Sequence, residues 1–356
     1  MSKITLVQPE TVGEGEAMIK VEHLKKKFGD FTAVDDISFE VKKGEVFGFL
    51  GPNGAGKSTS LRVLSTLARP SGGKASIGGH DIVKQDTEVR KLIGIVSEKM
   101  IMYDRLTARE NLWFFGKLFN IPNELLVKRI DELLDLVQLT KFRDVQVGTF
   151  STGMRQRLNV VRALLNMPRV LFLDEPTLGL DPQSTVEIRD FIKKLNRENG
   201  TTVIVTTHSM VDADLMCDRI GIIDHGKLVA LDTSANLKNL ISGNNGTVLE
   251  LNIQNLTPAL LQQVGGLPCV ESFSQGDSTH VKLLVKGEDA FDSVIDSVRQ
   301  GGGKIASIES QQPTLEDVFL HLTGHEVRDS ADQKMPVHRR GRWGGGGGGA
   351  TRRRVR

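Results

Sequence analysis

The chain has 356 residues, enough for about two domains of ordinary size. Removing the seven arginines of residues 337–356 from the formal net charge of +2 leaves −5 for the rest, which argues against a nucleic-acid binder that is basic throughout. The two cysteines, Cys217 and Cys269, form no CxxC pair, which favours free thiols in a reducing compartment over disulfides or structural zinc. No apolar run reaches the roughly 18 residues of a membrane helix and no signal-peptide pattern opens the chain, so the sequence predicts a soluble protein.

Short apolar runs alternate with helical patterns through residues 18–242, after a polar lead at 1–17 that we expect to be flexible. The predicted strands cover residues 45–50, 92–96, 170–174 and 202–206. The run Val-Leu-Phe-Leu-Asp at 170–174 has no polar face, which is typical of a strand buried on both sides of a parallel sheet. Apolar spacing predicts a helix over 186–195, and a hairpin is expected over 219–233. This alternation favours an α/β fold.

Residues 99–160 interrupt that alternation. Apolar residues there recur at helical spacing and strand signals are absent, so we expect a helical subdomain. The residues that mark its amphipathic helix are Leu126, Ile130, Leu133, Leu134 and Val137.

A second domain is predicted at 247–324, after a glycine- and asparagine-rich joint at 242–246. Its patterns follow the order β-α-β-β-α-β, which is that of a ferredoxin-like α+β domain, and end in a helix. The predicted elements cover residues 248–253, 258–264, 270–274, 280–285, 289–299, 304–309 and 314–322. Beyond them, residues 325–356 include six consecutive glycines and predict a disordered tail. A tether to anionic lipid or nucleic acid is the less favoured interpretation of that tail.

A phosphate-binding loop is the clearest motif. The segment matches GxxxxGK[ST], follows a predicted strand and precedes a helical run, which is the context that this motif requires. Its residues are Gly51, Pro52, Asn53, Gly54, Ala55, Gly56, Lys57 and Ser58. Glycines let backbone N–H groups point at phosphate oxygens, and a helix N-terminus adds positive charge. We expect Lys57 to reach the β- and γ-phosphates of a bound nucleotide, Ser58 to bind Mg²⁺, and Thr59 to lie near the α- or β-phosphate.

Two carboxylates stand where the predicted strand 170–174 ends, namely Asp174 and Glu175. Ligands bind α/β sheets at the carboxyl ends of parallel strands. Asp174 suits Mg²⁺ binding through water, and Glu175 suits activation of the attacking water. In isolation a solvated strand end would be the simpler interpretation, but the phosphate loop makes the catalytic one stronger.

Further motifs resemble the nucleotide-binding domain of ABC transporters. Residues 150–157 stand where that family has its LSGGQ signature, residues 176–181 resemble the D-loop, and His208 resembles the switch histidine. The resemblance covers residues 18–242 in the family's order and spacing. It implies a P-loop nucleotide hydrolase fold, ATP and Mg²⁺ as cofactors, and catalytic roles for Lys57, Glu175 and His208.

The same resemblance implies that two nucleotide-binding subunits, identical or paralogous, enclose the nucleotides head to tail. The signature residues would then act on the ATP held by the opposite subunit, with Asp181 coupling the two sites. Those residues are Ser151, Thr152, Gly153 and Met154. Thr152 and Met154 depart from the usual glycine and glutamine, but the serine and the second glycine remain, so ATPase activity is expected, and the sequence does not determine its rate.

Two other positions have roles only by resemblance. Phe28 matches the aromatic residue that stacks on adenine, although it also suits a core position. Glu98 stands where the Q-loop usually has glutamine, and its carboxylate suits a contact to Mg²⁺ or its water.

The stretch 103–115 resembles subunits paired with ABC-2-type permeases, and residues 313–324 resemble the drug-resistance and sodium-extrusion group. Aromatic residues at 113–115 suit either a groove for a permease helix or the interior of the helical subdomain. The resemblance implies an exporter ATPase at the cytoplasmic face of the membrane, with an integral membrane permease as partner and no nucleic acid. A soluble ABC-type ATPase acting on ribosomes or DNA is the alternative, and a non-hydrolysing regulator is a third.

Overall fold

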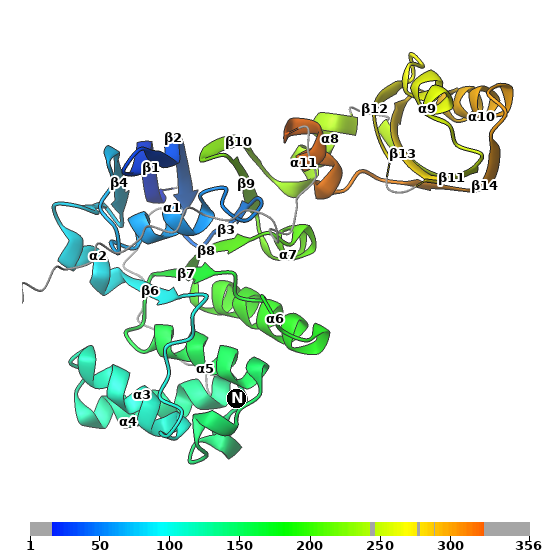
Figure 1. The fold of residues 1–356 in the computed structure, drawn as a ribbon. Helices are drawn as coiled ribbons and strands as arrows, with labels where there is room; N and C mark the ends of the chain where they lie inside the picture. Colours follow the sequence, from blue (N-terminus) through cyan, green and yellow to red (C-terminus); the bar gives the residue numbers. More distant parts are fainter. Residues whose placement is uncertain (1–15, 243–245, 276–277, 288, 324–356) are drawn as a thin grey trace, which may run out of the picture.

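The structure, a computed structural model, describes residues 16–242, 246–275, 278–287 and 289–323. The tail predicted at 325–356, most of the lead and most of the joint at 242–246 lie outside the described residues. Figure 1 shows a larger α/β part joined through α8 (Ser234–Ser242) to a smaller one.

A six-stranded sheet runs through the larger part in the order β10-β9-β3-β8-β7-β6. Neighbouring strands are parallel except β10, which pairs antiparallel with β9. The strands are β3 (Val46–Leu50), β6 (Ile93–Val96), β7 (Val170–Asp174), β8 (Thr202–Thr207), β9 (Arg219–Asp224) and β10 (Lys227–Asp232). The hairpin and the parallel strands agree with the sequence predictions. The strand expected from residue 92 begins one residue later because Leu92 still belongs to α2 (Asp86–Leu92).

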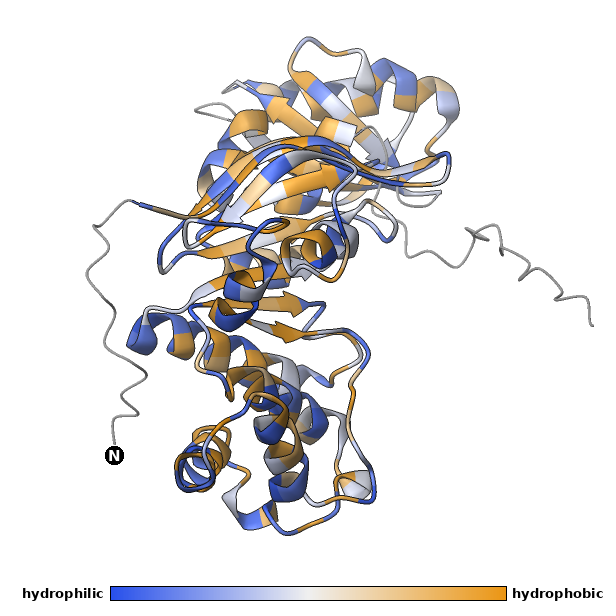
Figure 2. Ribbon diagram, turned by 90° about the vertical axis from the view of Figure 1, so that its left-hand side faces the viewer, coloured by the Kyte–Doolittle hydropathy of each residue, from blue (hydrophilic) through white to orange (hydrophobic). Residues whose placement is uncertain are grey.

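Both faces of this sheet are covered, as the all-apolar strand indicated. Every residue of β3, β7 and β8 is buried. Along β7, Leu171 and Leu173 face one hydrophobic cluster, while Val170 and Phe172 face another, because successive side chains of a strand point to opposite sides. Figure 2 shows the sheet largely in the colours of apolar residues, with polar residues on the outer surfaces of the helices.

Helix α1 (Lys57–Leu64) lies against one face, beneath an antiparallel sheet of order β2-β1-β4-β5. That sheet consists of β1 (Ala17–Phe28), β2 (Phe31–Lys42), β4 (Gly72–Ile77) and β5 (His80–Asp81). The opposite face packs against α5 (Thr152–Leu164) and α6 (Pro182–Asn199). The phosphate-loop helix and the signature helix therefore lie on opposite sides of the central sheet.

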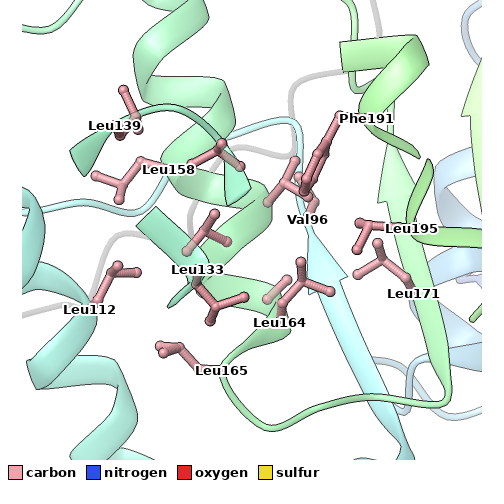
Figure 3. Packing of buried hydrophobic residues seen from close by; sticks show 14 of the residues in the cluster. Val96, Leu112, Leu133, Leu139, Leu158, Leu164, Leu165, Leu171, Phe191 and Leu195 are labelled. Carbon is pink, nitrogen blue, oxygen red and sulfur yellow. The ribbon is translucent and has the colours of Figure 1, made fainter. Parts of the chain in front are cut away.

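The helical subdomain is present. It comprises α3 (Ala108–Leu118), α4 (Asn123–Leu136), the 3₁₀ turns η1 (Thr140–Phe142) and η2 (Val147–Thr149), and the start of α5. All of residues 99–160 are described, and none of them forms a strand beyond one isolated bridge between Thr107 and Gln146. The five apolar residues that predicted the amphipathic helix are all buried. Figure 3 shows Leu112, Leu133 and Leu158 converging in the core that continues to Val96 and Leu171 of the sheet.

The smaller part has a four-stranded antiparallel sheet of order β12-β13-β11-β14. Its elements are β11 (Gly246–Gln254), α9 (Pro258–Gly265), β12 (Val270–Gln275), β13 (His280–Lys286), α10 (Ala290–Gln300), β14 (Lys304–Gln311) and α11 (Leu315–Thr323). The first six confirm the ferredoxin-like order. Helices α9 and α10 cover one face of the sheet through Leu260, Val264, Val294 and Val298.

The last helix, α11, packs on the other face of that sheet and reaches across to the larger part. Its Val318 and Phe319 are fully buried with Leu237 of α8 and Val248 of β11. The same cluster includes Ala213 of α7 (Met210–Met216), the helix that follows β8. The sequence predicted this helix but not its position between the two parts.

An ion pair fastens α11 to the sheet. Lys282 Nζ lies 2.8 Å from Asp317 Oδ1 and 3.4 Å from Glu250 Oε1. Burial by itself would lower the pKa of Lys282, but the hydrogen bonds and charges of Asp317 and Glu250 outweigh it and hold that pKa above its ordinary value. Asp317 also accepts a hydrogen bond from the backbone N–H of Thr314, so one carboxylate joins the start of α11 to β13.

Candidate active site

The phosphate loop connects β3 to α1 and is held in shape by its neighbours. A side chain at Gly51 would place its Cβ 2.1 Å from the carbonyl oxygen of Ile223, so only glycine fits there. Gly56 has a φ of +109° and similarly close contact with Ala33, which again requires glycine. The backbone N–H of Gly226, in the β9–β10 turn, donates to the carbonyl of Ala55 at 2.9 Å. The loop is thereby fixed at the N-terminus of α1, where anions are favoured.

Lys57 is the first residue of α1, and its side chain is only 4% exposed. Its Nζ donates to the carbonyl of Gly51 at 2.7 Å and of Pro52 at 3.1 Å, and lies 3.3 Å from Glu175 Oε1. Burial lowers the pKa of Lys57, although the carboxylates of Glu175 and Asp174 oppose that shift. A buried ammonium held by loop carbonyls and a carboxylate is well placed to donate hydrogen bonds to phosphate oxygens.

Asp174, at the end of β7, accepts hydrogen bonds from two hydroxyl groups on one carboxylate oxygen. Ser58 donates to Asp174 Oδ1 at 2.8 Å, and Thr206 donates to the same oxygen at 2.6 Å. Ser58 comes from α1 and Thr206 from β8, the strand next to β7. The structure therefore brings two of the three residues predicted to bind Mg²⁺, Ser58 and Asp174, into direct contact. Their hydroxyl and carboxylate oxygens are the hard donors that Mg²⁺ prefers.

Glu175 and His208 also meet. His208 Nδ1 lies 2.9 Å from Glu175 Oε2, and the backbone N–H of His208 lies 3.4 Å from the same oxygen. Glu175 adopts a φ of +48°, in the left-handed region that a non-glycine residue adopts only where its surroundings impose it. Its backbone N–H is held by the carbonyl and the hydroxyl of Thr206, both at 3.1 Å. The side chain of Glu175 is thus aimed at Lys57 and His208 together.

The signature residues lie elsewhere. Ser151 is exposed and caps the N-terminus of α5, where its hydroxyl accepts from the backbone N–H of Met154 at 3.2 Å. Asp181 caps α6 in the same way through Ser184, whose hydrogen bonds lower the pKa of the Asp181 carboxyl. Gly153 faces Ser184 so closely that a Cβ on it would lie 2.3 Å from the serine oxygen. No contact recorded among the described residues links Ser151 or Asp181 to the phosphate loop.

Phe28 and Glu98, two further positions assigned by resemblance, are on the surface. The Phe28 ring is 50% exposed, which excludes a core position, and Lys26 Nζ lies 4.7 Å from its centroid. Glu98 is exposed just after β6. Thr152 is exposed and Met154 half-buried at the start of α5.

The sequence left two interpretations of the aromatic residues in the stretch 103–115, a groove for a permease helix or the interior of the helical subdomain, and each fits part of the stretch. Phe115 is buried in the subdomain core and Trp113 packs against it. Tyr103 and Phe114 are 47% and 38% exposed, with their ring centroids 5.0 Å apart. Part of this stretch is therefore core and part is an exposed aromatic surface.

Comparison with known proteins agrees with this site. A family model described as ABC transporter matches residues 34–178. The linearmycin resistance ATP-binding protein LnrL of Bacillus subtilis (strain 168) is 38% identical over 315 residues, which cover 88% of this chain and 100% of that protein. The daunorubicin resistance ATP-binding protein DrrA2 of Streptomyces coeruleorubidus is 37% identical over 318 residues, covering 88% of this chain and 97% of that protein. The chain belongs to the ABC transporter family.

Solved structures of ABC ATPases share the fold. The subunit cbiO1 from Clostridium perfringens, part of the ABC transporter complex cbiONQ, is similar with a TM-score of 0.59 and 28% identity, over 63% of this chain and 93% of that one. The ATP-binding cassette MJ0796, in a dimeric post-hydrolysis state bound to ADP and Pi, gives a TM-score of 0.55 and 30% identity, over 61% of this chain and 98% of that one. These findings confirm the P-loop α/β fold predicted from the sequence. They also identify the chain as the ATP-binding, ATP-hydrolysing subunit of an ABC transporter.

Sequence reasoning missed several polar residues that hold this ABC site together. Thr206 joins Asp174 to the backbone of Glu175, and Gln156 Nε2 donates to the carbonyl of Pro176 at 2.7 Å. Both are buried, Thr206 fully and Gln156 with 4% exposure. In the sequence, each of these residues is a polar residue in an otherwise apolar strand or helix face. That pattern identifies a buried polar group but does not identify its hydrogen-bond partner.

Proposed function

We propose that this ATPase works as a dimer and powers export through a separately encoded membrane permease, at the cytoplasmic face of the membrane. The observation that carries the proposal is the separation of Ser151 from the phosphate loop by the central sheet. An exposed serine at a helix N-terminus suits a γ-phosphate. Ser151 lies away from its own subunit's phosphate loop, so only a second subunit can bring a bound γ-phosphate to Ser151. Relatives named for drug resistance align with 88% of the chain and nearly all of their own length, which supports export as the direction.

Magnesium fits the residues present. Ser58 and Asp174, already 2.8 Å apart, would hold it together with the nucleotide, with Glu98 as a further candidate. When bound, the ion neutralises charge on the β- and γ-phosphates.

The chain's own residues perform the remaining work. Lys57 and the loop N–H groups bind the phosphates, and Phe28 stacks on the base. Glu175 orients and deprotonates the attacking water, while His208 holds the Glu175 carboxylate and the γ-phosphate in line. Lys57, next to Glu175, keeps that carboxylate from swinging away from the site. Asp181, at the start of α6, couples one site to the other.

The dimer is tested with two variants of the purified full chain. Glu175→Gln removes the base, so it should bind ATP without turnover and migrate as a dimer in size-exclusion chromatography with ATP and as a monomer without it. Ser151→Ala should lower turnover at least about tenfold while costing roughly 1 kcal/mol as a lost helix cap. Thr107→Ala removes an equivalent cap from α3 and should leave turnover unchanged. Full turnover by monomers, with Ser151→Ala as active as the parent, contradicts the proposal. Mixed dimers with a co-expressed paralogue distinguish a heterodimer from a homodimer.

The permease is tested by copurification. Within the described residues, no helix is both long and apolar enough to cross a membrane. The exposed Tyr103 and Phe114 rings suit a permease helix. Membrane fractions should therefore retain the subunit only when a multi-helix membrane protein is co-expressed, and Phe114→Ser should weaken that retention. Retention on ribosomes or DNA instead would favour the alternative of a soluble ABC-type ATPase.

A further inference from the structure

A buried carboxylate next to the catalytic residues has no role in the mechanism above. Asp212 lies on α7, four residues after His208, and is 5% exposed. Its own backbone N–H donates to Ser209 Oγ at 3.2 Å, which caps the helix directly behind His208. Burying a charge is costly unless it is paired and hydrogen-bonded, so the partners of Asp212 indicate what it does.

Its two oxygens bind two different elements. Oδ2 accepts from the hydroxyl of Thr177 at 2.5 Å, and Oδ1 lies 3.2 Å from Arg189 Nη1. Thr177 is 9% exposed and the side chain of Arg189 is 15% exposed, so water screens this pair far less than a surface ion pair. Removing one member would leave the others buried without their partner.

Each partner belongs to a different part of the catalytic machinery. Thr177 follows Glu175 by two residues, in the turn that carries its left-handed backbone. Arg189 is on α6, the helix that begins at the D-loop residue Asp181. Asp212 is on the helix that begins just after His208. A single carboxylate therefore ties the general base, the switch histidine and the D-loop helix together.

We propose that Asp212 is a positioning residue for hydrolysis, which holds the Glu175 turn against the His208 helix through Thr177. The inference rests on the proposed roles of Glu175 and His208 and deepens them. A strained backbone at Glu175 persists only where its surroundings over-determine it, and the Thr177 hydroxyl is one of those constraints. Loss of that constraint shifts the carboxylate relative to the water, and a misplacement of about 1 Å costs on the order of 100-fold in rate.

The alternative is that Asp212 only stabilises α7. A matched control lies on the same helix. Asp214 accepts from Ser234 at 2.5 Å and from Lys238 at 2.7 Å, so it joins α7 to α8 and not to the site. Asp214→Asn makes the same chemical change two residues further along, and should lower stability without lowering turnover.

The experiment measures kcat and KM for ATP, together with thermal unfolding, on the full chain. Asp212→Asn and Thr177→Val should each lower kcat about 10- to 100-fold with KM changed less than about threefold, since the nucleotide contacts are intact. The double variant should be no slower than the worse single one, because both remove the same link. Thr177→Ser keeps the hydroxyl and should recover kcat to within about threefold of the parent.

The proposal is overturned if Asp212→Asn lowers kcat no more than Asp214→Asn, or if Thr177→Ser is as slow as Thr177→Val. If Asp212→Asn does not fold, the two Thr177 variants decide alone. Glu175→Gln distinguishes a failure of the proposed general base from a failure of the proposed positioning role. If that variant keeps full turnover, the proposed base is wrong. If it is inactive while Asp212→Asn is fast, only the positioning role is wrong.

Discussion

Gly153→Ala should destabilise the protein, although alanine is the better helix residue. Gly153 is the second residue of α5, and its added Cβ would lie 2.3 Å from Ser184 Oγ and 2.9 Å from Ser184 Cβ. The nearer distance is roughly 1 Å short of a normal contact. Ser184 Oγ is also bound to Asp181 Oδ2 at 2.6 Å, so moving it away breaks that hydrogen bond.

The expected size follows from two opposed effects. Overpacking of this kind costs about 1–3 kcal/mol, whereas replacing glycine by alanine in a helix gains up to about 1 kcal/mol. The net effect should be a loss of about 1–2 kcal/mol, seen as a lower urea midpoint at constant slope. A double-mutant cycle with Ser184→Gly should return a coupling energy of about 1 kcal/mol or more. If Gly153→Ala instead raises the midpoint, the close approach of α5 and α6 is wrong, because propensity alone predicts a gain.

Three other predictions concern buried groups. Thr206→Val keeps the shape of the side chain but removes a hydroxyl from Asp174, so it should cost about 1–3 kcal/mol in thermal unfolding and lower turnover; equal stability would contradict the network. Phe319→Ala should cost about 3–5 kcal/mol because Phe319 is fully buried, whereas Phe291→Ala, at a side chain 40% exposed, should cost clearly less; equal losses in urea unfolding would show that α11 does not dock. The raised pKa of Lys282 contributes stability that is complete below its ordinary value of 10.5 and is lost as pH rises through the higher folded value. The free energy of unfolding of the parent should therefore fall relative to that of Lys282→Met as the pH rises through that alkaline range. Parallel pH profiles of the two free energies would refute this.

The sequence by itself determined the parts of this protein whose groups are contiguous. The phosphate loop needs glycines, a lysine and a serine within eight positions, between a strand and a helix. Its function can therefore be recognised from the sequence without knowledge of the tertiary structure. The β-α-β-β-α-β order and the amphipathic helix at 126–137 were equally accessible, because apolar periodicity is a local property. Ser58 and Asp174 could each be assigned to Mg²⁺ in the same way, from the phosphate-loop motif and from the rule that ligands bind at the carboxyl ends of parallel strands.

Only the tertiary structure decided which buried polar groups meet. Thr206 reaches Asp174, and Thr177 reaches Asp212, across 32 and 35 residues of sequence. Such pairs depend on strand register and on helix placement, which no local pattern records. The same holds for α11, whose amphipathic sequence required a partner without specifying that α7 and α8 would provide it. Periodicity determines that a side chain is buried, whereas the packing of distant segments determines what it touches.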